Sequence, residues 1–235
     1  MHGKNKIRKQ VHNANLLQVN SVFYTIQGEG PFSGRPAVFI RLTGCNLRCW
    51  FCDTQWDDNH DPYVQPQDII EAALTEYEAS TAPELAVITG GEPCRQDLSL
   101  LIKLLKRAKF EVQVETAGTI WQDCLVDTHI VVSPKTPKVA QGFMQYTNNT
   151  SWKYVVNAGA LLDVDGLPVH SHQERGKGGA VARPPSALGK EHVYLQPCDE
   201  YDELANTRNL ELVRTLTLVH GYRASVQLHK ILEID

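Results

Sequence analysis

The feature that most constrains this chain is a compressed cysteine triplet, Cys45, Cys49 and Cys52, which follows an apolar run. Three thiolates this close together can hold three irons of a cubane cluster, and the loop has no fourth cysteine to complete the set. The fourth iron would then be open to a ligand. Structural zinc is the main alternative, but it prefers four closed ligands, usually as paired CxxC units, and the sequence has no second CxxC. The triplet therefore favours an iron-sulfur cluster over zinc.

Composition narrows the class of partner. The chain has 235 residues, enough for one large domain, and a formal net charge of −4. The sequence contains no sustained Lys/Arg run of the kind that would indicate a nucleic-acid partner. It also contains no apolar run as long as a membrane span. A small-molecule substrate is therefore expected. The other three cysteines, Cys94, Cys124 and Cys198, are scattered singly and are not a disulfide framework. Thiolate ligands of this kind favour a cytoplasmic location.

Short apolar runs alternate with helical patterns, which predicts an α/β fold with a parallel sheet or barrel. Strands are expected at residues 20–26, 37–43, 85–89, 110–115, 129–133, 152–156, 192–196 and 223–228. Helices are expected at 67–80, about 98–108 and 203–220, with Gly221 ending the last one. Residues 1–18 are expected to form a flexible basic arm and 19–235 a single domain. Within that domain, the glycine- and proline-rich residues 157–191 are expected to be a loop insertion, either a mobile surface loop or an ordered lid or interface element.

From the second strand onward, polar or glycine-rich clusters follow the apolar runs. They are the cysteine loop, GGEP (90–93), ETAG (115–118), SPK (133–135) and QPCD (196–199). In parallel βα folds, ligands bind where the carboxyl ends of the strands open into loops. The sequence therefore predicts that the five clusters converge on one site.

Taken together, these motifs resemble the radical S-adenosylmethionine (SAM) superfamily and, more narrowly, the 7-carboxy-7-deazaguanine synthase family. The matching segments are QGEG (27–30), the CxxxCxxC triplet, CDT (52–54), TGGEP (89–93), ETAG, SPK, QP (196–197) and HK (229–230). They occur in order over about residues 19–235. The resemblance implies a partial (β/α)6 TIM-like barrel of the radical SAM type, with truncated helical crossovers.

The resemblance also implies an activity. It is that of a carbon–nitrogen lyase that contracts 6-carboxy-5,6,7,8-tetrahydropterin to 7-carboxy-7-deazaguanine with loss of ammonia, in queuosine and deazapurine biosynthesis. The implied cofactors are a 4Fe-4S cluster, SAM and Mg²⁺. A flavodoxin- or ferredoxin-like electron donor and a homodimer are implied as partners.

By the same resemblance, site residues carry over position by position. Cys45, Cys49 and Cys52 would hold the cluster, and Thr54 would bind Mg²⁺, which prefers hard oxygen ligands. The expected SAM-binding residues are Gly91, Glu92, Ser133, Pro134, Lys135, Gln196, Pro197, Cys198 and Asp199. The expected substrate-binding residues are Ile26, Gln27, Gly28, Glu29, Arg41, Thr89, His229 and Asp235. A structural role is an equal alternative for Cys198 and Asp199, and a frayed tail is the alternative for Asp235.

Physical chemistry supports two of these assignments directly. Arg41 can pair with a carboxylate in bidentate fashion, as a carboxylated pterin requires. Glycine at position 91 would let the backbone approach the methionine amino group closely. Two other functions remain open at this point. A glycyl-radical-activating radical SAM enzyme shares the cysteine loop but leaves QGEG, CDT and HK unexplained, and a non-catalytic iron-sulfur or zinc module would need only the cysteines.

Overall fold

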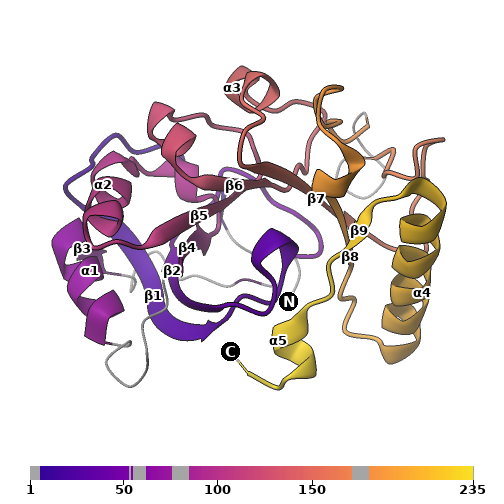
Figure 1. The fold of residues 1–235 in the computed structure, drawn as a ribbon, viewed down its shortest axis with the longest axis horizontal. Coiled ribbons are helices and arrows are strands. Elements are labelled where there is room, and N and C mark those ends of the chain that lie inside the picture. Colours follow the sequence, from indigo (N-terminus) through magenta and orange to yellow (C-terminus); the bar gives the residue numbers. More distant parts are fainter. Residues whose placement is uncertain (1–5, 53, 55–61, 76–84, 171–179, 235) are drawn as a thin grey trace.

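The computed structural model describes residues 6–52, 54, 62–75, 85–170 and 180–234. Its strands form one curved sheet in the order β3-β1-β2-β4-β5-β6-β7-β8-β9 (Figure 1). The strands are β1 (Leu17–Ile26), β2 (Pro36–Leu42), β3 (Tyr63–Val64), β4 (Leu85–Gly90), β5 (Glu111–Thr116), β6 (His129–Val132), β7 (Thr150–Val156), β8 (Val193–Pro197) and β9 (Arg223–Ala224). From β2 to β9 each neighbouring pair is parallel, and the sheet does not close into a barrel.

The first two strands depart from the parallel pattern. β1 pairs antiparallel with β2, and β3 pairs antiparallel with β1. Only residues 27–35 join β1 to β2. A parallel crossover needs about a dozen residues or more, so this connection can only produce an antiparallel neighbour. The six longer parallel strands, β2 and β4 to β8, confirm the expected partial barrel.

Helices cover the convex face of the sheet (Figure 1). They are α1 (Pro66–Thr75), α2 (Ser99–Arg107), α3 (Gln141–Gln145) and α4 (Glu203–His220), while α5 (Leu228–Ile231) lies on the concave side. Short 3-10 turns fill other connections: η1 (Gly30–Phe32), η2 (Pro93–Arg95), η3 (Asp123–Asp127) and η4 (Lys190–His192). The crossover from β5 to β6 contains only η3, and that from β6 to β7 only α3, so the truncated crossovers are confirmed. Among the described residues, none of the helices has both the length and the hydropathy of a bilayer-spanning segment.

Alternation along the strands divides the interior into two regions. In β2, Val38, Ile40 and Leu42 join the main core under the helices. The intervening Phe39 and Arg41 face the concave side, because successive side chains of a strand point to opposite faces. On that side Phe32 of η1 packs with the small cluster formed by Ala37, Leu85 and Val87. This apolar cluster lies toward the amino ends of β2 and β4, which leaves the carboxyl ends to form a cavity.

The helix and strand ends mostly agree with the expectation, with one clear error. α4 spans the expected residues, begins with the Asp202 side chain accepting from the Ala205 N–H at 2.7 Å, and ends at Gly221 with φ +76°. The strand expected at 223–228 is wrong beyond residue 224, because the chain leaves the sheet and forms α5. The end of the helix expected at 67–80 lies outside the described residues after Thr75.

The described parts of the loop insertion, 157–170 and 180–191, pack against the body of the protein. Leu167 and Val181 are buried in the main core. The Arg183 guanidinium pairs with Asp165 at 2.7 Å. It also donates to the carbonyls of Pro168 and Val181, which lie in the two described parts of the insertion. The described residues of this segment are therefore packed on the body of the protein, and a role as a lid or an interface element stays a prediction.

Candidate active site

A cavity of about 270 Å³ opens at the carboxyl ends of the parallel strands. Residues from all five clusters noted in the sequence line it, so the predicted convergence is confirmed. The predicted site residues on its wall are Gln27, Glu29, Arg41, Cys45, Cys49, Cys52, Thr54, Thr89, Gly91, Ser133, Lys135, Gln196, Pro197, Asp199 and His229. Five described residues from the prediction are not on the wall: Ile26, Gly28, Glu92, Pro134 and Cys198. Asp235 lies outside the described residues.

The cysteine loop contributes three thiols, none of them in a disulfide, to one wall. The Leu47 N–H donates to Cys45 Sγ at 3.3 Å, and the Cys52 N–H donates to the Cys49 carbonyl at 3.3 Å. Burial, with the Glu92 carboxylate as a further cause, raises the pKa of the Cys45 thiol to about 12. The protein surroundings alone thus favour the neutral thiol, and a bound cation such as iron would stabilise the thiolate.

The three cysteines fit an iron-sulfur cluster in number, chemistry and position. Within the described ranges, no three His, Cys, Asp or Glu side chains have the arrangement of a preformed metal site. The three thiols line the same cavity. A donor set of three thiolates is nevertheless the one that such a cluster with an open iron requires.

Glu92 is fully buried and fastens two loops together. Its Oε1 accepts from the Cys94 N–H at 3.0 Å and from the Thr116 hydroxyl at 2.7 Å, and its Oε2 accepts from the Ala117 N–H at 2.7 Å. Burial raises the pKa of Glu92 above its ordinary value, against the effect of these hydrogen bonds. Its side chain therefore joins GGEP to ETAG instead of facing the cavity.

Gly91 is required for a reason that the sequence did not show. A Cβ at this position would lie 2.3 Å from the Gly44 carbonyl oxygen and 3.0 Å from Cys45 Cβ. The Glu92 N–H also donates to the Gly44 carbonyl at 3.0 Å. The glycine thus allows the loop after β4 to pack directly on the backbone that precedes the first cysteine.

Two further loops supply the side of the cavity expected to bind SAM. Lys135 Nζ donates to the Ser133 carbonyl at 2.8 Å and also contacts the Ser133 hydroxyl. Burial lowers the pKa of Lys135. On β8, Gln196 and Pro197 face the cavity, whereas Cys198 is buried with its N–H donating to the Val156 carbonyl at 2.8 Å.

Asp199 is held on the wall by several donors. Its Oδ1 accepts from the Tyr201 N–H and the Asn206 amide, both at 2.9 Å, and its Oδ2 pairs with Lys230. Burial alone would raise the pKa of Asp199, but these donors lower it to about 2. The carboxylate is therefore anionic at neutral pH and connects the loop after β8 to α5.

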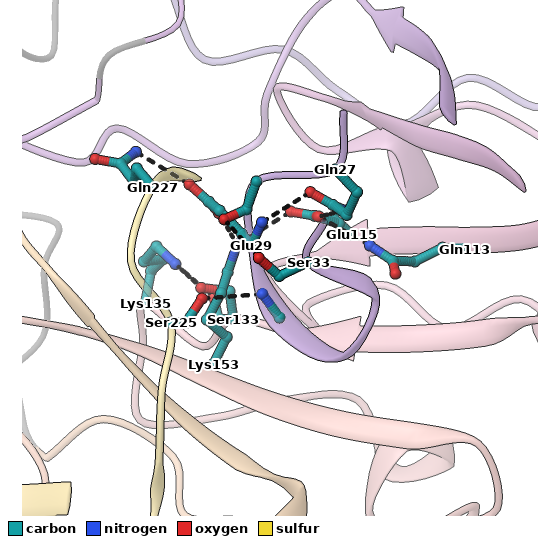
Figure 2. A network of polar contacts seen from close by, with 12 residues as sticks. Gln27, Glu29, Ser33, Gln113, Glu115, Ser133, Lys135, Lys153, Ser225 and Gln227 are labelled. Carbon is teal, nitrogen blue, oxygen red and sulfur yellow. Dashed lines mark hydrogen bonds and ion pairs between the residues drawn. The ribbon is translucent and has the colours of Figure 1, made fainter. Parts of the chain in front are cut away.

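A buried network of charges lines another part of the cavity (Figure 2). Lys153 on β7 forms ion pairs with Glu29 and, at 3.1 Å, with Glu115. The Gln27 amide donates to Glu115 at 2.9 Å, and the Gln227 amide donates to Glu29 at 3.0 Å. One lysine thus joins the turn after β1 to the end of β5 (Figure 2).

The electrostatics of the network follow from burial of unlike charges. Burial alone would raise the pKa of Glu29, but the Lys153 ammonium and the hydrogen bonds lower it below its ordinary value. Burial would lower the pKa of Lys153, but the two carboxylates raise it. Glu29 and Lys153 are therefore charged at neutral pH, and the lysine is shared between two carboxylates.

The remaining predicted substrate residues surround this network. The Arg41 guanidinium lies on the wall with its Cζ 5.2 Å from the centre of the Phe23 ring, and no carboxylate among the described residues pairs with it. Gly28 packs against α5, because a Cβ there would lie 2.2 Å from His229 Nδ1. Thr54 lies on the wall beside the cysteines, and its carbonyl accepts from Cys52 Sγ at 3.5 Å.

Sequence reasoning missed three residues of the network: Lys153, Glu115 and Gln227. Lys153 had a detectable signal, since it is the one charged residue in the apolar run WKYVV. A lysine in a strand that is buried throughout must have a partner. Glu115 belongs to the ETAG motif but was not assigned to the site. Gln227 had no signal, because it lies in a segment expected to be a strand.

The fold and this cavity define the class of the protein: an open parallel βα barrel with a CxxxCxxC loop at the carboxyl end of its strands is a radical SAM enzyme. Residues 39–137 match the family described as the Radical SAM superfamily. Members of that class use a 4Fe-4S cluster and SAM, and both belong to the site built here.

Full-length relatives narrow the assignment. The chain is 37% identical over 242 residues to the 7-carboxy-7-deazaguanine synthase of Rhodospirillum rubrum, with all of both chains covered. It is 36% identical to the enzyme of the same name from Rickettsia prowazekii, over 93% of this chain and 89% of that one. The crystal structure of QueE from Escherichia coli superposes with a TM-score of 0.63 at 25% identity, covering 91% of this chain and 95% of that one. The chain belongs to the 7-carboxy-7-deazaguanine synthase family.

Proposed function

We propose that this enzyme converts 6-carboxy-5,6,7,8-tetrahydropterin to 7-carboxy-7-deazaguanine and ammonia, as a carbon–nitrogen lyase of queuosine and deazapurine biosynthesis. The observation that supports this most strongly is the full-length match to the Rhodospirillum rubrum synthase. The cavity adds independent support, because it combines three thiols with a buried pair of carboxylates and an arginine.

On this proposal, Cys45, Cys49 and Cys52 hold the 4Fe-4S cluster. Together with SAM it supplies, when bound, a carbon-centred radical able to abstract hydrogen from C6 of the pterin. The protein's part is to bind, orient and exclude water. The residues proposed to bind SAM are Gly91, Glu92, Ser133, Pro134, Lys135, Gln196, Pro197, Cys198 and Asp199. For Glu92 and Cys198, which are buried off the wall, the proposed contribution is to hold the binding loops in place.

The charged network is proposed to bind the aminopyrimidine edge of the pterin. That edge presents N–H donors in a guanidine-like array, and Glu29 and Glu115 offer acceptors for them. Lys153 lowers the pKa of Glu29, so that this carboxylate accepts and does not donate. Gln27 orients Glu115 through the 2.9 Å hydrogen bond.

The pterin carboxylate is proposed to pair with Arg41, which faces the cavity from β2. Ile26 and Gly28 shape the turn after β1, Thr89 contributes a hydroxyl, and His229 closes this side from α5. Asp235 is proposed to reach the same substrate. Thr54 is proposed to bind Mg²⁺ beside the substrate.

The proposed setting is a cytoplasmic homodimer reduced by a flavodoxin- or ferredoxin-like protein. The apolar side chains of the C-terminal segment, such as Ile231 at 66% exposed, are consistent with a partner surface. Sedimentation of the purified chain would measure its oligomeric state.

The test is anaerobic incubation of the reconstituted protein with reductant, SAM and the carboxylated tetrahydropterin. We expect 7-carboxy-7-deazaguanine by mass spectrometry, and none from Cys49→Ala, which should also lose the brown colour of the cluster. Arg41→Met is expected to raise KM for the pterin by about tenfold or more, because a charge-assisted bidentate pair is lost. No product from a protein with a full cluster, alongside an active control enzyme, would rule out the proposal.

A further inference from the structure

The N-terminal segment expected to be a flexible arm contacts the cysteine loop. Residue Ile7 bridges in parallel to Cys45, and Val11 bridges in parallel to Gln96. The Arg8 N–H donates to the Cys45 carbonyl at 2.7 Å, and the Val11 N–H donates to the Arg95 carbonyl at 2.7 Å. One short segment thus joins the loop after β2 to the loop after β4 by backbone hydrogen bonds.

The side chain of Arg95 ties the same two loops from inside. Only 4% of Arg95 is exposed. Its Nη1 donates to the Lys9 carbonyl at 2.9 Å and its Nη2 donates to the Thr43 carbonyl at 2.9 Å. Because Thr43 lies two residues before Cys45, the guanidinium connects the N-terminal segment to the backbone that leads into the cysteine triplet. We name this unit, made of residues 7–11 and Arg95, the N-terminal brace.

The brace packs directly on the backbone of the cysteine loop, with the Arg95 guanidinium against Gly44. Gly44 has φ +86°, and a Cβ there would lie 2.7 Å from Arg95 Nε. On its other side, the Gly44 carbonyl accepts from the Glu92 N–H at 3.0 Å. The Arg95 guanidinium, Gly44 and Gly91 are therefore in direct contact one after the other, so the position of the brace is coupled to the backbone before the first cysteine.

We propose that the N-terminal brace is a positioning element for the iron-sulfur cluster, which fixes the backbone of Cys45 and so determines how firmly the protein retains iron. None of its residues lines the cavity. Binding one cluster fixes all three cysteines that line the cavity, so a cysteine whose backbone is already anchored reduces the conformational freedom that cluster binding must remove. The other two cysteines can then adjust around it.

The central test compares Arg8→Pro with Arg8→Ala. Proline removes the N–H that donates to Cys45, whereas alanine keeps this N–H and removes the side chain. Anaerobically reconstituted full-length proteins would be mixed with excess iron chelator, and loss of the cluster absorption followed over time. We expect Arg8→Pro to release iron about three- to tenfold faster than the parent, the effect of one net hydrogen bond, and Arg8→Ala to stay within twofold.

Arg95→Lys provides a second route to the same question. It keeps the buried charge but loses the planar fork that reaches Lys9 and Thr43 together, so faster release is again expected. The electron paramagnetic resonance spectrum of the reduced cluster with SAM is expected to change in both Arg8→Pro and Arg95→Lys.

Three results would overturn the proposal. The first is iron release at the parent rate from both Arg8→Pro and Arg95→Lys, and the second is iron release from Arg8→Ala as fast as from Arg8→Pro. The third is an unchanged electron paramagnetic resonance spectrum in Arg8→Pro and Arg95→Lys, with only a lower thermal midpoint. The last result would indicate a merely structural contact. The proposal rests on the cluster and not on the substrate, and chelation requires no turnover, so it can fail while the proposed function stands.

Discussion

Replacing Lys153 by methionine tests the charged network most directly. Methionine has a similar length but no charge, so Glu29 and Glu115 would face each other in a buried site without their shared cation. Removing one partner of a buried ion pair typically costs about 3–5 kcal/mol, because the remaining charge is uncompensated. Lys153 is only 5% exposed, which places it in this category. For a chain of this size the expected fall in thermal midpoint is about 6–20 °C.

The same substitution has a predicted pH dependence. In the parent, the pKa of Glu29 is lowered, so its contribution to stability is present above the ordinary pKa and is lost as pH falls through the folded-state value. The raised pKa of Lys153 contributes stability below about pH 10.5 that is lost as pH rises further. In Lys153→Met, burial of Glu29 is no longer opposed by the ammonium and is expected to raise its pKa, so the variant gains stability relative to the parent as pH falls. The loss of stability in Lys153→Met relative to the parent is therefore expected to be smaller at pH 5.5 than at pH 7.5.

The assay is anaerobic thermal unfolding of reconstituted proteins at one heating rate, at pH 7.5 and pH 5.5. Lys153→Arg is the matched control, since it keeps the charge and should lose less stability than methionine. The reasoning would be refuted if Lys153→Met were less stable than the parent by under about 1 kcal/mol at pH 7.5, or if the loss of stability were equal at both pH values. KM for the pterin is expected to rise in Lys153→Met while KM for SAM changes little.

Two glycine substitutions separate the two halves of the cavity. Gly91→Ala should raise KM for SAM at least about tenfold and reduce iron content, because a Cβ 2.3 Å from a backbone carbonyl forces the two loops apart. Gly159→Ala is its control, since nothing lies within 4 Å of a Cβ there, and equal losses in both variants would contradict the prediction. Gly28→Ala should instead raise KM for the pterin, because its Cβ would displace His229. KM is measured by titrating SAM and the pterin in turn. A higher KM for the pterin in Gly91→Ala, or for SAM in Gly28→Ala, would contradict the assignment of the two halves.

The parallel strands were predictable because each is a short apolar run ended by glycine or polar residues, as in β4 and its GGEP turn. The antiparallel β1 was not stated in advance, although the short connection of residues 27–35 requires it. The end of the chain was mispredicted because Ser225 and Gln227 alternate like strand residues. Their side chains instead bind the turn after β1, with Ser225 accepting from the Gly30 N–H at 2.9 Å.

Within the site, the residues of the motifs were predictable, but the residues that contact and position them were not. The cysteines and Arg41 follow recognisable patterns that end a strand. Lys153 was missed because a lone lysine in a strand gives no hint of which carboxylates it will meet across the sheet. The reason for Gly91 was also hidden, since the atom it accommodates, the Gly44 carbonyl oxygen, belongs to another loop.

The hydrogen bonds from Gln227 to Glu29 and from Gly30 to Ser225 join residues almost 200 positions apart. Closing so long a loop costs chain entropy that only a largely folded sheet can offset, so we expect this corner of the cavity to form last during folding. The pterin side of the cavity would then be assembled after the side that holds the cysteines. Partial unfolding would open it first, while the iron-binding half is still intact.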